Sequence, residues 1–287
     1  MINLNLKVRH AIMEDYNQIA NLIFYEANTH RHLDWRSALE WIGTQNYWVL
    51  EDHGRIIAAL ACPEDPQQIA WIRLFSYHQD LSSFETWSVL WDVACHEILS
   101  INPNVQITAI VTKQWFQNIL ISSGFKLKQN IVILQLNLKN AVYLSEPQGV
   151  KIRPMLEEDL PAVTELDLAA FGGFWHNTFA SLQRAHSQSF CSRVAENESG
   201  MVGYQISTGN PFGAHLARLG VRPEAQGRGI GRALVDNLNH YLTENQINKL
   251  SVNTQSDNEA SLSLYQKIGF VRTGEYFPVL VYQNGVA

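Results

Sequence analysis

Hydrophobic positions recur along this chain with two different periods, and each change of period marks a predicted element. Between 16 and 22, and again between 160 and 166, apolar residues return every three or four positions, which predicts amphipathic helices. Short apolar runs such as 214–221 (AHLARLGV) predict strands, and the turns at Gly54 and Gly200 predict hairpins. Strands that alternate with helices, together with a hairpin, predict an α/β fold in which helices cover a mixed sheet (α+β).

This order of predicted elements occurs twice. The segment LKVRHAIMEDYNQIANLI (6–23) matches VKIRPMLEEDLPAVTELD (150–167), and further matches follow at a near-constant offset of about 145 residues. The matched positions are Arg9 and Arg153, Gly54 and Gly200, Arg73 and Arg218, and Gly124 and Gly269. We therefore predict two tandem copies of one fold, residues 1–146 and 147–287, joined near the turn-rich SEPQG (145–149).

Composition narrows the class of protein. A hydrophobic content of 46% and a charged content of 17% are typical of a globular protein with a core. The formal net charge of −6 provides no basic surplus, which argues against a general nucleic-acid binder. No apolar stretch suits a signal peptide or a membrane helix. Because Cys62, Cys95 and Cys191 are too few and too scattered for a disulfide framework or a zinc site, we expect a cytoplasmic location.

The second copy contains a glycine-rich loop between a predicted strand and a predicted helix. In VRPEAQGRGIGRALVDNL (221–238), glycines stand at 227, 229 and 231, just before a helical apolar face. The first turn of a helix has unpaired N–H groups and the positive end of the dipole, which favour phosphate. Glycine lets these N–H groups approach an anion closely, and Arg228 and Arg232 would add positive charge. The loop therefore predicts a pyrophosphate site.

The register of the glycines decides between phosphate-binding motifs. It fits neither the dinucleotide fingerprint nor the Walker loop. Gln226 to Gly231 instead match Q/R-x-x-G-x-G/A, and residues 150–287 resemble the GNAT superfamily of N-acetyltransferases, where this pattern binds coenzyme A. The resemblance implies acetyl-CoA as the co-substrate. The residues that it implies in coenzyme A binding are Leu219, Gly220, Val221, Gln226, Gly227, Arg228, Gly229, Ile230, Gly231, Arg232 and Asn258.

Acetyl transfer to an amine needs a base, an oxyanion site and an acid for the departing thiolate. In SDNEASLSLYQKIGF (256–270), a helix opening with a capping box at Ser256 would place Asn258 and Tyr265 two turns apart. The resemblance implies Tyr265 as the acid, and an ordinary core tyrosine is the alternative. It also implies the backbone amide of Val221 as the oxyanion donor.

The base has a candidate on the strand that precedes the glycine loop. Histone-acetylating members of the superfamily carry a glutamate at the position of His215. On a regular strand, His215 would share a face with Val221, and a neutral imidazole could take the proton directly or through water. The alternative is a structural, hydrogen-bonded histidine. Trp175 and His176, in FGGFWHNTF, are further candidates for the substrate pocket, although an aromatic core and a surface histidine would also explain them.

The first copy keeps the hydrophobic pattern but not the chemistry. Counted back along the repeat, the glycine loop falls on Leu81 to Thr86, which contains no glycine, and Tyr265 falls on Leu120. We expect a degenerate copy that does not bind coenzyme A in the usual way, in a tandem layout similar to that of mycothiol synthase. In HRHLDW (30–35), histidines and an aspartate alternate, but the surroundings predict a helix or loop and no fourth ligand, so we expect no metal site.

The sequence thus predicts an N-acetyltransferase that moves acetyl from acetyl-CoA to a primary amine of a small molecule or peptide by direct attack in the C-terminal copy. Two alternatives remain open. One is a non-catalytic acyl-CoA-binding module whose doubled fold serves association, and the other is a transferase that uses a longer acyl-CoA. The identity of the amine and the oligomeric state are also left open.

Overall fold

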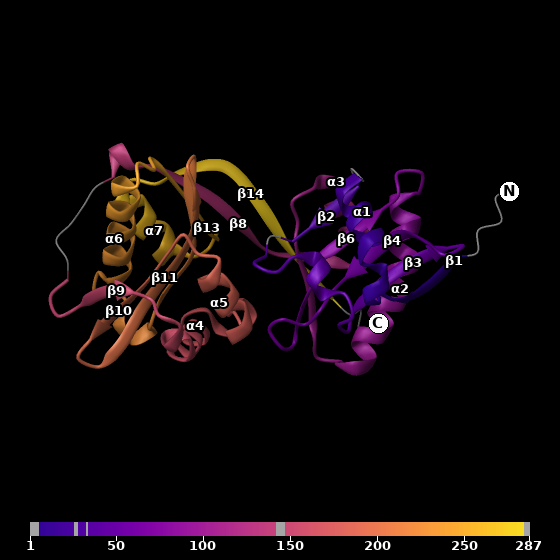
Figure 1. The fold of residues 1–287 in the computed structure, drawn as a ribbon, viewed down its shortest axis with the longest axis horizontal. Helices are drawn as coiled ribbons and strands as arrows, with labels where there is room; N and C mark the ends of the chain where they lie inside the picture. The colour runs from indigo at the N-terminus through magenta and orange to yellow at the C-terminus, as the bar shows by residue number, and fades with distance from the viewer. Residues whose placement is uncertain (1–5, 26–27, 33, 142–146, 284–287) are drawn as a thin grey trace. The chain divides into compact units, whose positions relative to one another are not determined.

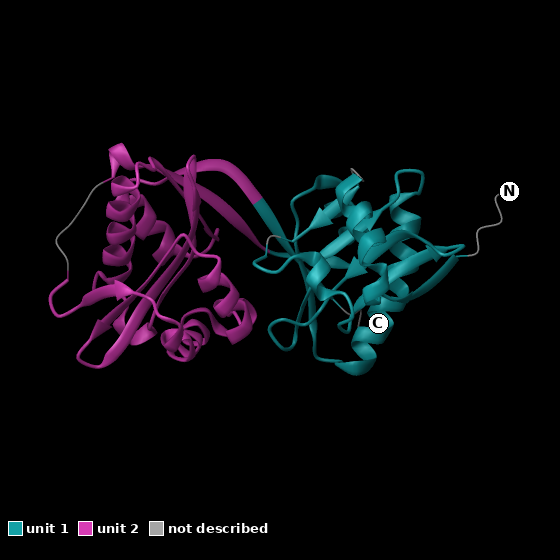
Figure 2. Cartoon of the chain, in the orientation of Figure 1, with its two compact units in different colours: residues 1–128, 277–287 teal, residues 129–276 magenta. Residues whose placement is uncertain are grey.

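The computed structural model describes residues 6–25, 28–32, 34–141 and 147–283. The chain divides into two compact units, drawn in teal and magenta in Figure 2. The first unit is Met1–Lys128 with Phe277–Ala287, and the second is Gln129–Tyr276. Strands and helices alternate through both units, so the predicted α/β architecture with helices covering sheets is confirmed (Figure 1).

The first unit is built on an antiparallel sheet with the strand order β1-β3-β4-β6-β2. Its strands are β1 (Leu6–His10), β2 (Thr29–Arg31), β3 (Tyr47–Asp52), β4 (Arg55–Ala61) and β6 (Leu74–Tyr77). A parallel pair, β5 (Ile69–Trp71) with β7 (Gln106–Ile110), continues the unit. Its helices are α1 (Tyr16–Tyr25), α2 (Ser83–Ile101) and α3 (Gln114–Ser122).

The second unit has one mixed sheet between two pairs of helices (Figure 1). Its strands are β8 (Phe125–Asn137), β9 (Lys151–Pro154), β10 (Cys191–Asn197), β11 (Gly200–Asn210), β12 (Gly213–Val221), β13 (Lys249–Gln255) and β14 (Val271–Tyr282). Its helices are α4 (Leu160–Trp175), α5 (Phe179–Ser187), α6 (Ile230–Glu244) and α7 (Glu259–Ile268). A Cβ at Gly220 would meet Leu166 of α4, whereas one at Gly231 of α6 would meet Leu219 and Val221, so α4 and α6 cover opposite faces.

The repeat predicted from the sequence reappears in the contacts of the two units. In the first, Arg9 donates to Asp15 at 2.6 Å and to Glu51 at 2.7 Å. In the second, Arg153 donates to Asp159 at 2.7 Å and pairs with Glu196. Both aspartates also accept the backbone N–H three residues before them, at 2.9 Å and 2.8 Å. An equivalent arginine in each copy, Arg9 or Arg153, therefore links the first strand of that copy to the start of its first helix.

The last strand of each sequence repeat extends into the other compact unit. In β8, Ile131 to Asn137 pair antiparallel with β13, and in β14, Val279 to Val281 pair antiparallel with β7. The boundary near residue 146 is a boundary between sequence repeats, and its reading as a domain boundary stays a prediction. Residues 142–146, which hold the start of SEPQG, lie outside the described residues.

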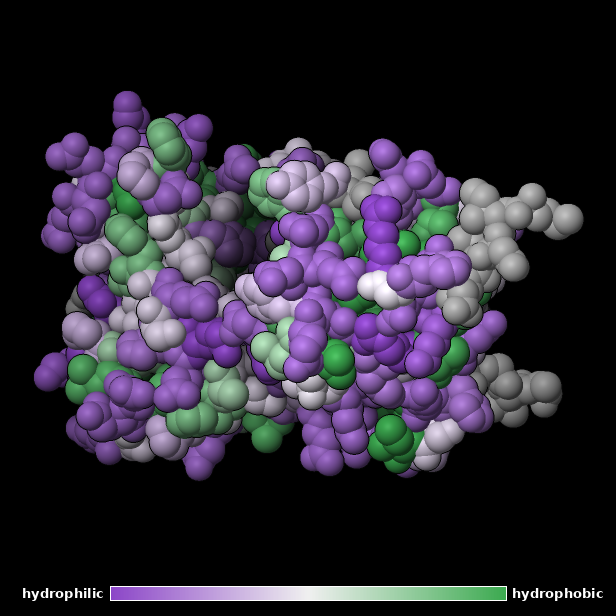
Figure 3. Space-filling view, turned by 45° about the vertical axis from the view of Figure 1, so that its right-hand side comes forward, coloured by the Kyte–Doolittle hydropathy of each residue, from purple (hydrophilic) through white to green (hydrophobic). Residues whose placement is uncertain are grey.

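The surface agrees with the composition. On the face shown in Figure 3, hydrophilic residues dominate and hydrophobic residues form small separate groups. Among the helices that the structure describes, none has both the length and the apolar character needed to cross a lipid bilayer. All three cysteines are unpaired, with Cys62 and Cys191 buried.

Candidate active site

The glycine loop lies where the sequence predicts it, between the end of β12 and the start of α6. Gly227 and Gly229 both have left-handed backbone conformations, with φ of 75° and 83°, which a side chain would strain. Gly229 is the N-cap of α6, and its carbonyl accepts the Ala233 N–H at 2.9 Å. The amides of Ile230 and Gly231 therefore precede the first helical hydrogen bond of α6 and are available to an anion.

The loop forms one wall of a cleft of about 490 Å³ between the end of β12, α6 and α7. The cleft brings together every residue that the resemblance implies in coenzyme A binding, except Arg228, whose side chain is exposed and does not line it. Ala170 and Phe171 of α4 line it as well. A Cβ at Gly231 would point toward Leu264, Val221 and Leu219 at 3.4–4.0 Å, so this glycine helps to keep the cleft open.

Two residues of the cleft are held by contacts that the sequence analysis did not anticipate. The guanidinium of Arg232 donates to Asp236 at 2.9 Å and to the Lys267 carbonyl at 3.2 Å, so part of its charge is neutralised within the protein. Asn258, rather than Ser256, caps α7, and its side chain accepts the Ser261 N–H at 3.1 Å. The capping box predicted at Ser256 is therefore wrong, because the helix begins only at Glu259.

Tyr265 follows the cleft residue Leu264 on α7 but does not itself line the cleft. Its side chain is only 4% exposed and packs against Phe270, with 5.3 Å between the ring centroids. The hydroxyl makes no hydrogen bond to a described residue. Burial raises the pKa of Tyr265, which keeps the phenol protonated. The role of Tyr265 as acid stays a prediction, as does that of the Val221 amide.

His215 lies on β12, but it does not share a face with Val221. The pairing of β12 with β11 shifts register between Ile206 and Ser207, which places a β-bulge at Ala217. Leu216 packs with the cluster under α6, and so does Leu219, three residues further on. His215 therefore faces the other side of the sheet from Leu219 and Val221. The strict alternation assumed from the sequence is wrong here.

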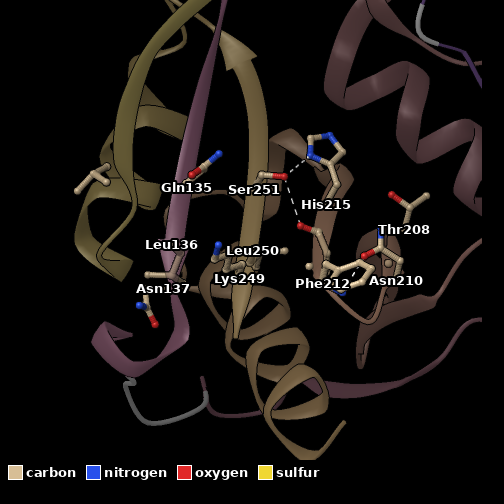
Figure 4. Close-up of a pocket in the computed structure, with 14 residues that line it drawn as sticks. Gln135, Leu136, Asn137, Thr208, Asn210, Phe212, His215, Lys249, Leu250 and Ser251 are labelled. Atoms are coloured by element: carbon tan, nitrogen blue, oxygen red, sulfur yellow. Dashed lines mark hydrogen bonds between the residues drawn. The ribbon is translucent and has the colours of Figure 1, made fainter. Parts of the chain in front are cut away.

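The Ser251 hydroxyl holds one nitrogen of the His215 ring. Its oxygen lies 2.9 Å from Nδ1 of His215 and 3.3 Å from the Ala214 carbonyl oxygen (Figure 4). With Nδ1 engaged by Ser251, Nε2 is the ring nitrogen left for a ligand. Nε2 has no hydrogen-bond partner among the described residues. Burial lowers the pKa of His215, so the imidazole is neutral at physiological pH.

A buried ionic network, which the sequence analysis missed, holds α4 against β12. Arg218 donates to both carboxylate oxygens of Asp167, at 2.7 and 2.9 Å, and the Tyr204 hydroxyl also donates to Asp167. Burial opposes the charge of Arg218, but Tyr204 and Asp167 outweigh it and raise the pKa of the guanidinium. The sequence contains hints of this network. Arg218 is one of the matched positions of the repeat, and Asp167 directly follows the apolar positions of the predicted helix.

The same network positions the turn after α4. The Asp167 carboxylate accepts the Asn177 N–H at 2.6 Å, and Arg218 donates to the Trp175 carbonyl at 2.7 Å. The Arg218 guanidinium also lies 3.4 Å over the ring centroid of Phe171, a cleft residue. His176 bonds to carbonyls of its own turn, and neither Trp175 nor His176 lines the cleft. Their role in substrate binding stays a prediction.

Replacing Asp167 with alanine should lower the free energy of unfolding by about 3–5 kcal/mol, because the Arg218 guanidinium would be left buried without its partner. The matched control is Glu51→Ala, which removes a partly exposed partner of Arg9 and should cost less than about 1 kcal/mol. Urea unfolding followed by circular dichroism measures both. Equal losses in the two variants would show that the network does not contribute as argued.

In the first unit, aromatic rings stand where the second unit has its cleft. Phe75 packs toward α2 and α3 as the cleft residue Leu219 packs toward α6 and α7, so a phenyl ring takes the place of Leu219. Phe116 lies on α3 at the position of the cleft residue Ser261 on α7. The two rings stack with centroids 5.7 Å apart, and Trp87 packs against both at 5.1 and 5.4 Å. In the first unit, aromatic side chains therefore fill the space that corresponds to the cleft of the second unit.

The described residues of the HRHLDW segment take part in this packing. His30 is fully buried and stacks on Phe116, and Asp34 pairs with Arg73 at 2.6 Å. His30 and His32 have lowered pKa values because both are buried. No group of three or more histidines, cysteines and acids suited to a metal ion occurs among the described residues.

Comparison with known proteins places the second copy in a family. The family model for the "Acetyltransferase (GNAT) family" matches residues 157–270. A mycothiol acetyltransferase of Amycolatopsis mediterranei is 27% identical over 178 residues, which cover 54% of this chain and 58% of that protein. The N-alpha-acetyltransferase RimI of Mycobacterium tuberculosis is 30% identical over 135 residues, 45% of this chain and 84% of that protein. The chain spans about half the length of the mycothiol acetyltransferases that it matches.

Solved structures show the same fold over nearly the whole chain. A tandem GNAT protein from the clavulanic acid biosynthesis pathway aligns with a TM-score of 0.65 and 16% identity, over 99% of this chain and 100% of that one. A GCN5-related N-acetyltransferase from Sphaerobacter thermophilus aligns with a TM-score of 0.62 and 15% identity, over 96% and 95% of the two chains. The tandem architecture predicted from the internal repeat is thereby confirmed.

Proposed function

Because this chain belongs to the GNAT family of acetyltransferases, we propose that its second copy moves acetyl from acetyl-CoA to a primary amine by direct attack. The observation that carries the proposal is the cleft at the start of α6. Two left-handed glycines and the amides of Ile230 and Gly231 form one end of it, and Asn258 lies at the start of α7 on its border. These groups suit the two phosphates of coenzyme A and the amide-containing arm that joins them to the thioester.

The residues of the second copy account for each proton in the reaction. Because His215 lies on the other face of β12 from Val221, its Nε2 accepts the proton of the amine through water as the nitrogen bonds to the thioester carbon. The amide N–H of Val221 donates to the oxyanion that forms. As the carbon–sulfur bond breaks, the Tyr265 hydroxyl donates its proton to the sulfur. Proton exchange with solvent then restores His215 to its neutral form and Tyr265 to its protonated form.

We propose that the two copies, 1–146 and 147–287, have different roles, acetyl transfer in the second and structural support in the first. The aromatic rings at Phe75 and Phe116 occupy the place of the coenzyme A cleft in the first copy, so acetyl-CoA binds in the second copy alone. The first copy then serves as structural support and contributes strand β8 to the sheet of the second unit. The unpaired state of the three cysteines supports a cytoplasmic location.

The test of this proposal is coenzyme A release from acetyl-CoA by the full chain, with and without primary amines, compared with Tyr265→Phe. The variant keeps the buried ring but has no proton to donate, so turnover should fall about a hundredfold, the low end for loss of a general acid. The affinity for acetyl-CoA, measured by calorimetry, should stay within about twofold because Tyr265 does not line the cleft. Unchanged turnover would remove the acid role, and no release with any amine would leave only a coenzyme A-binding module.

A further inference from the structure

A second pocket of the second unit, of about 650 Å³, lies over His215 and shares no lining residue with the coenzyme A cleft. Strands β12 and β13 pair only at Ala214–Leu216 and Leu250–Val252, so beyond Leu216 they part and open a path from the cleft to the face of His215. Four neighbouring strands build it in two cross-strand rows (Figure 4). The first row is Gln135, Ser251, His215 and Thr208, which are paired from β8 through β13 and β12 to β11. The second row is Asn137, Lys249, Gly213 and Asn210.

Alternation along these strands separates the pocket from the core. The residues between the two rows, among them Leu136 and Leu250, pack in the hydrophobic cluster with α6 and α7. The two rows therefore face the opposite side of the sheet. Gly213 has no side chain and so leaves a gap in the second row. A Cβ at this position would lie 3.6 Å from Lys249, an ordinary contact distance, so a side chain could fill the gap without a clash. The pocket is thus a consequence of register and of one missing side chain.

The lining has a distinct chemical character. It offers three side-chain amides, two hydroxyls, the imidazole and one ammonium group, with no aspartate or glutamate among the described residues that line it. Lys249 has no ion-pair partner in the described part of the chain. In a protein of net charge −6, a pocket without any carboxylate does not suit a ligand with several positive charges. It suits a ligand that presents oxygen atoms to N–H and O–H donors.

His215 and Lys249 define an axis within this pocket. Lys249 stands two residues before Ser251, the partner of His215 on the next strand. Strand geometry places the backbone of Lys249 about 8 Å from the backbone of His215. An amine whose nitrogen faces Nε2 of His215 would therefore present a group a few carbon atoms away to the ammonium of Lys249.

We propose that this pocket holds the acceptor and that it selects primary amines bearing an anionic oxygen group. The inference rests on the proposed transfer reaction and names its substrate class. Nε2 of His215 faces the reacting nitrogen, Lys249 pairs with the anionic group, and the amides of Gln135 and Asn137 hydrogen-bond to the ligand between them. Both amides lie on β8, which belongs to the first sequence repeat, so the degenerate copy supplies one wall of the acceptor pocket.

Three amines of equal chain length test the proposal: 4-aminobutyrate, 4-aminobutanol and 1,4-diaminobutane. With the full chain and saturating acetyl-CoA, kcat/KM should fall in that order. Lys249→Gln should lower kcat/KM for 4-aminobutyrate about tenfold, as expected for one charge-assisted contact, and leave 4-aminobutanol within about twofold. Lys151→Gln, on exposed β9 outside the pocket, is the matched control and should change neither value.

A second variant and a binding measurement separate this inference from the transferase proposal. Gly213→Leu fills the pocket and should abolish binding of 4-aminobutyrate, followed by saturation-transfer NMR in the presence of coenzyme A, while coenzyme A still binds. Binding that both variants weaken, without acetylated product, would support the pocket and overturn the transferase. Transfer with the cationic amine preferred, transfer that neither variant changes, or no binding of 4-aminobutyrate would overturn the pocket assignment.

Discussion

Replacing Gly229 with glutamate should abolish acetyl-CoA binding, with a dissociation constant at least about a thousandfold higher. The carboxylate would stand at the N-cap of α6, in the cleft where we propose that the pyrophosphate binds. Like charges about 4 Å apart near a protein surface repel by about 4 kcal/mol, and about 1.4 kcal/mol corresponds to a factor of ten in the dissociation constant. Isothermal titration calorimetry with coenzyme A measures the effect directly.

Two controls separate charge from backbone strain at this position. Gly229→Ala keeps the unfavourable positive φ but adds no charge, and the nearest atom to its Cβ, in Pro147, is 3.9 Å away. It should bind coenzyme A far more tightly than Gly229→Glu. Gly200→Glu places the same side chain on an exposed left-handed glycine of the β10–β11 hairpin, away from the cleft, and should not change the affinity. Retained binding in Gly229→Glu would refute the phosphate site.

The parts of the site that sequence reasoning found are those set by local geometry. A glycine that must adopt positive φ leaves a mark in the sequence, and Gly227, Gly229 and the hairpin residues Gly54 and Gly200 all have that conformation. The strand before the loop and the helix after it follow from periodicity alone. The end of β12, the glycine turn and the start of α6 could therefore be predicted as one continuous unit of backbone, and phosphate binding by this unit stays a prediction.

The parts that sequence reasoning missed depend on pairing between distant segments. The bulge at Ala217 reverses which face His215 presents, and nothing within LARLGV distinguishes a bulged strand from a regular one. The pairing of β8 with β13 joins residues of different repeats, so the row of Gln135, Ser251 and His215 exists only after folding. The Arg232–Asp236 pair, by contrast, is an i,i+4 contact that the sequence already contained.

Burial explains how the first copy can keep the fold without an open cleft. A channel for a ligand is a void until the ligand binds, and an unfilled void costs packing energy. Phe75 and Phe116 fill the corresponding space, and both are completely buried. These aromatic residues thus stabilise the first unit, and the hydrophobic pattern of the repeat survives.

Replacing His215 with alanine should lower kcat at saturating amine about 10²–10⁴-fold, because the amine loses the group that accepts its proton. Burial lowers the pKa of His215, so the active neutral form persists below the ordinary histidine value of 6.5, and activity should fall only as the pH drops through the lowered value. In the variant, this fall should disappear from the kcat profile. Ser251→Ala, which keeps the imidazole but removes the hydroxyl that orients it through Nδ1, should cost less and leave KM for acetyl-CoA unchanged. A kcat profile identical to that of the unmodified chain in His215→Ala would show that water or another group takes the proton, and His215 would then be a structural residue of the pocket.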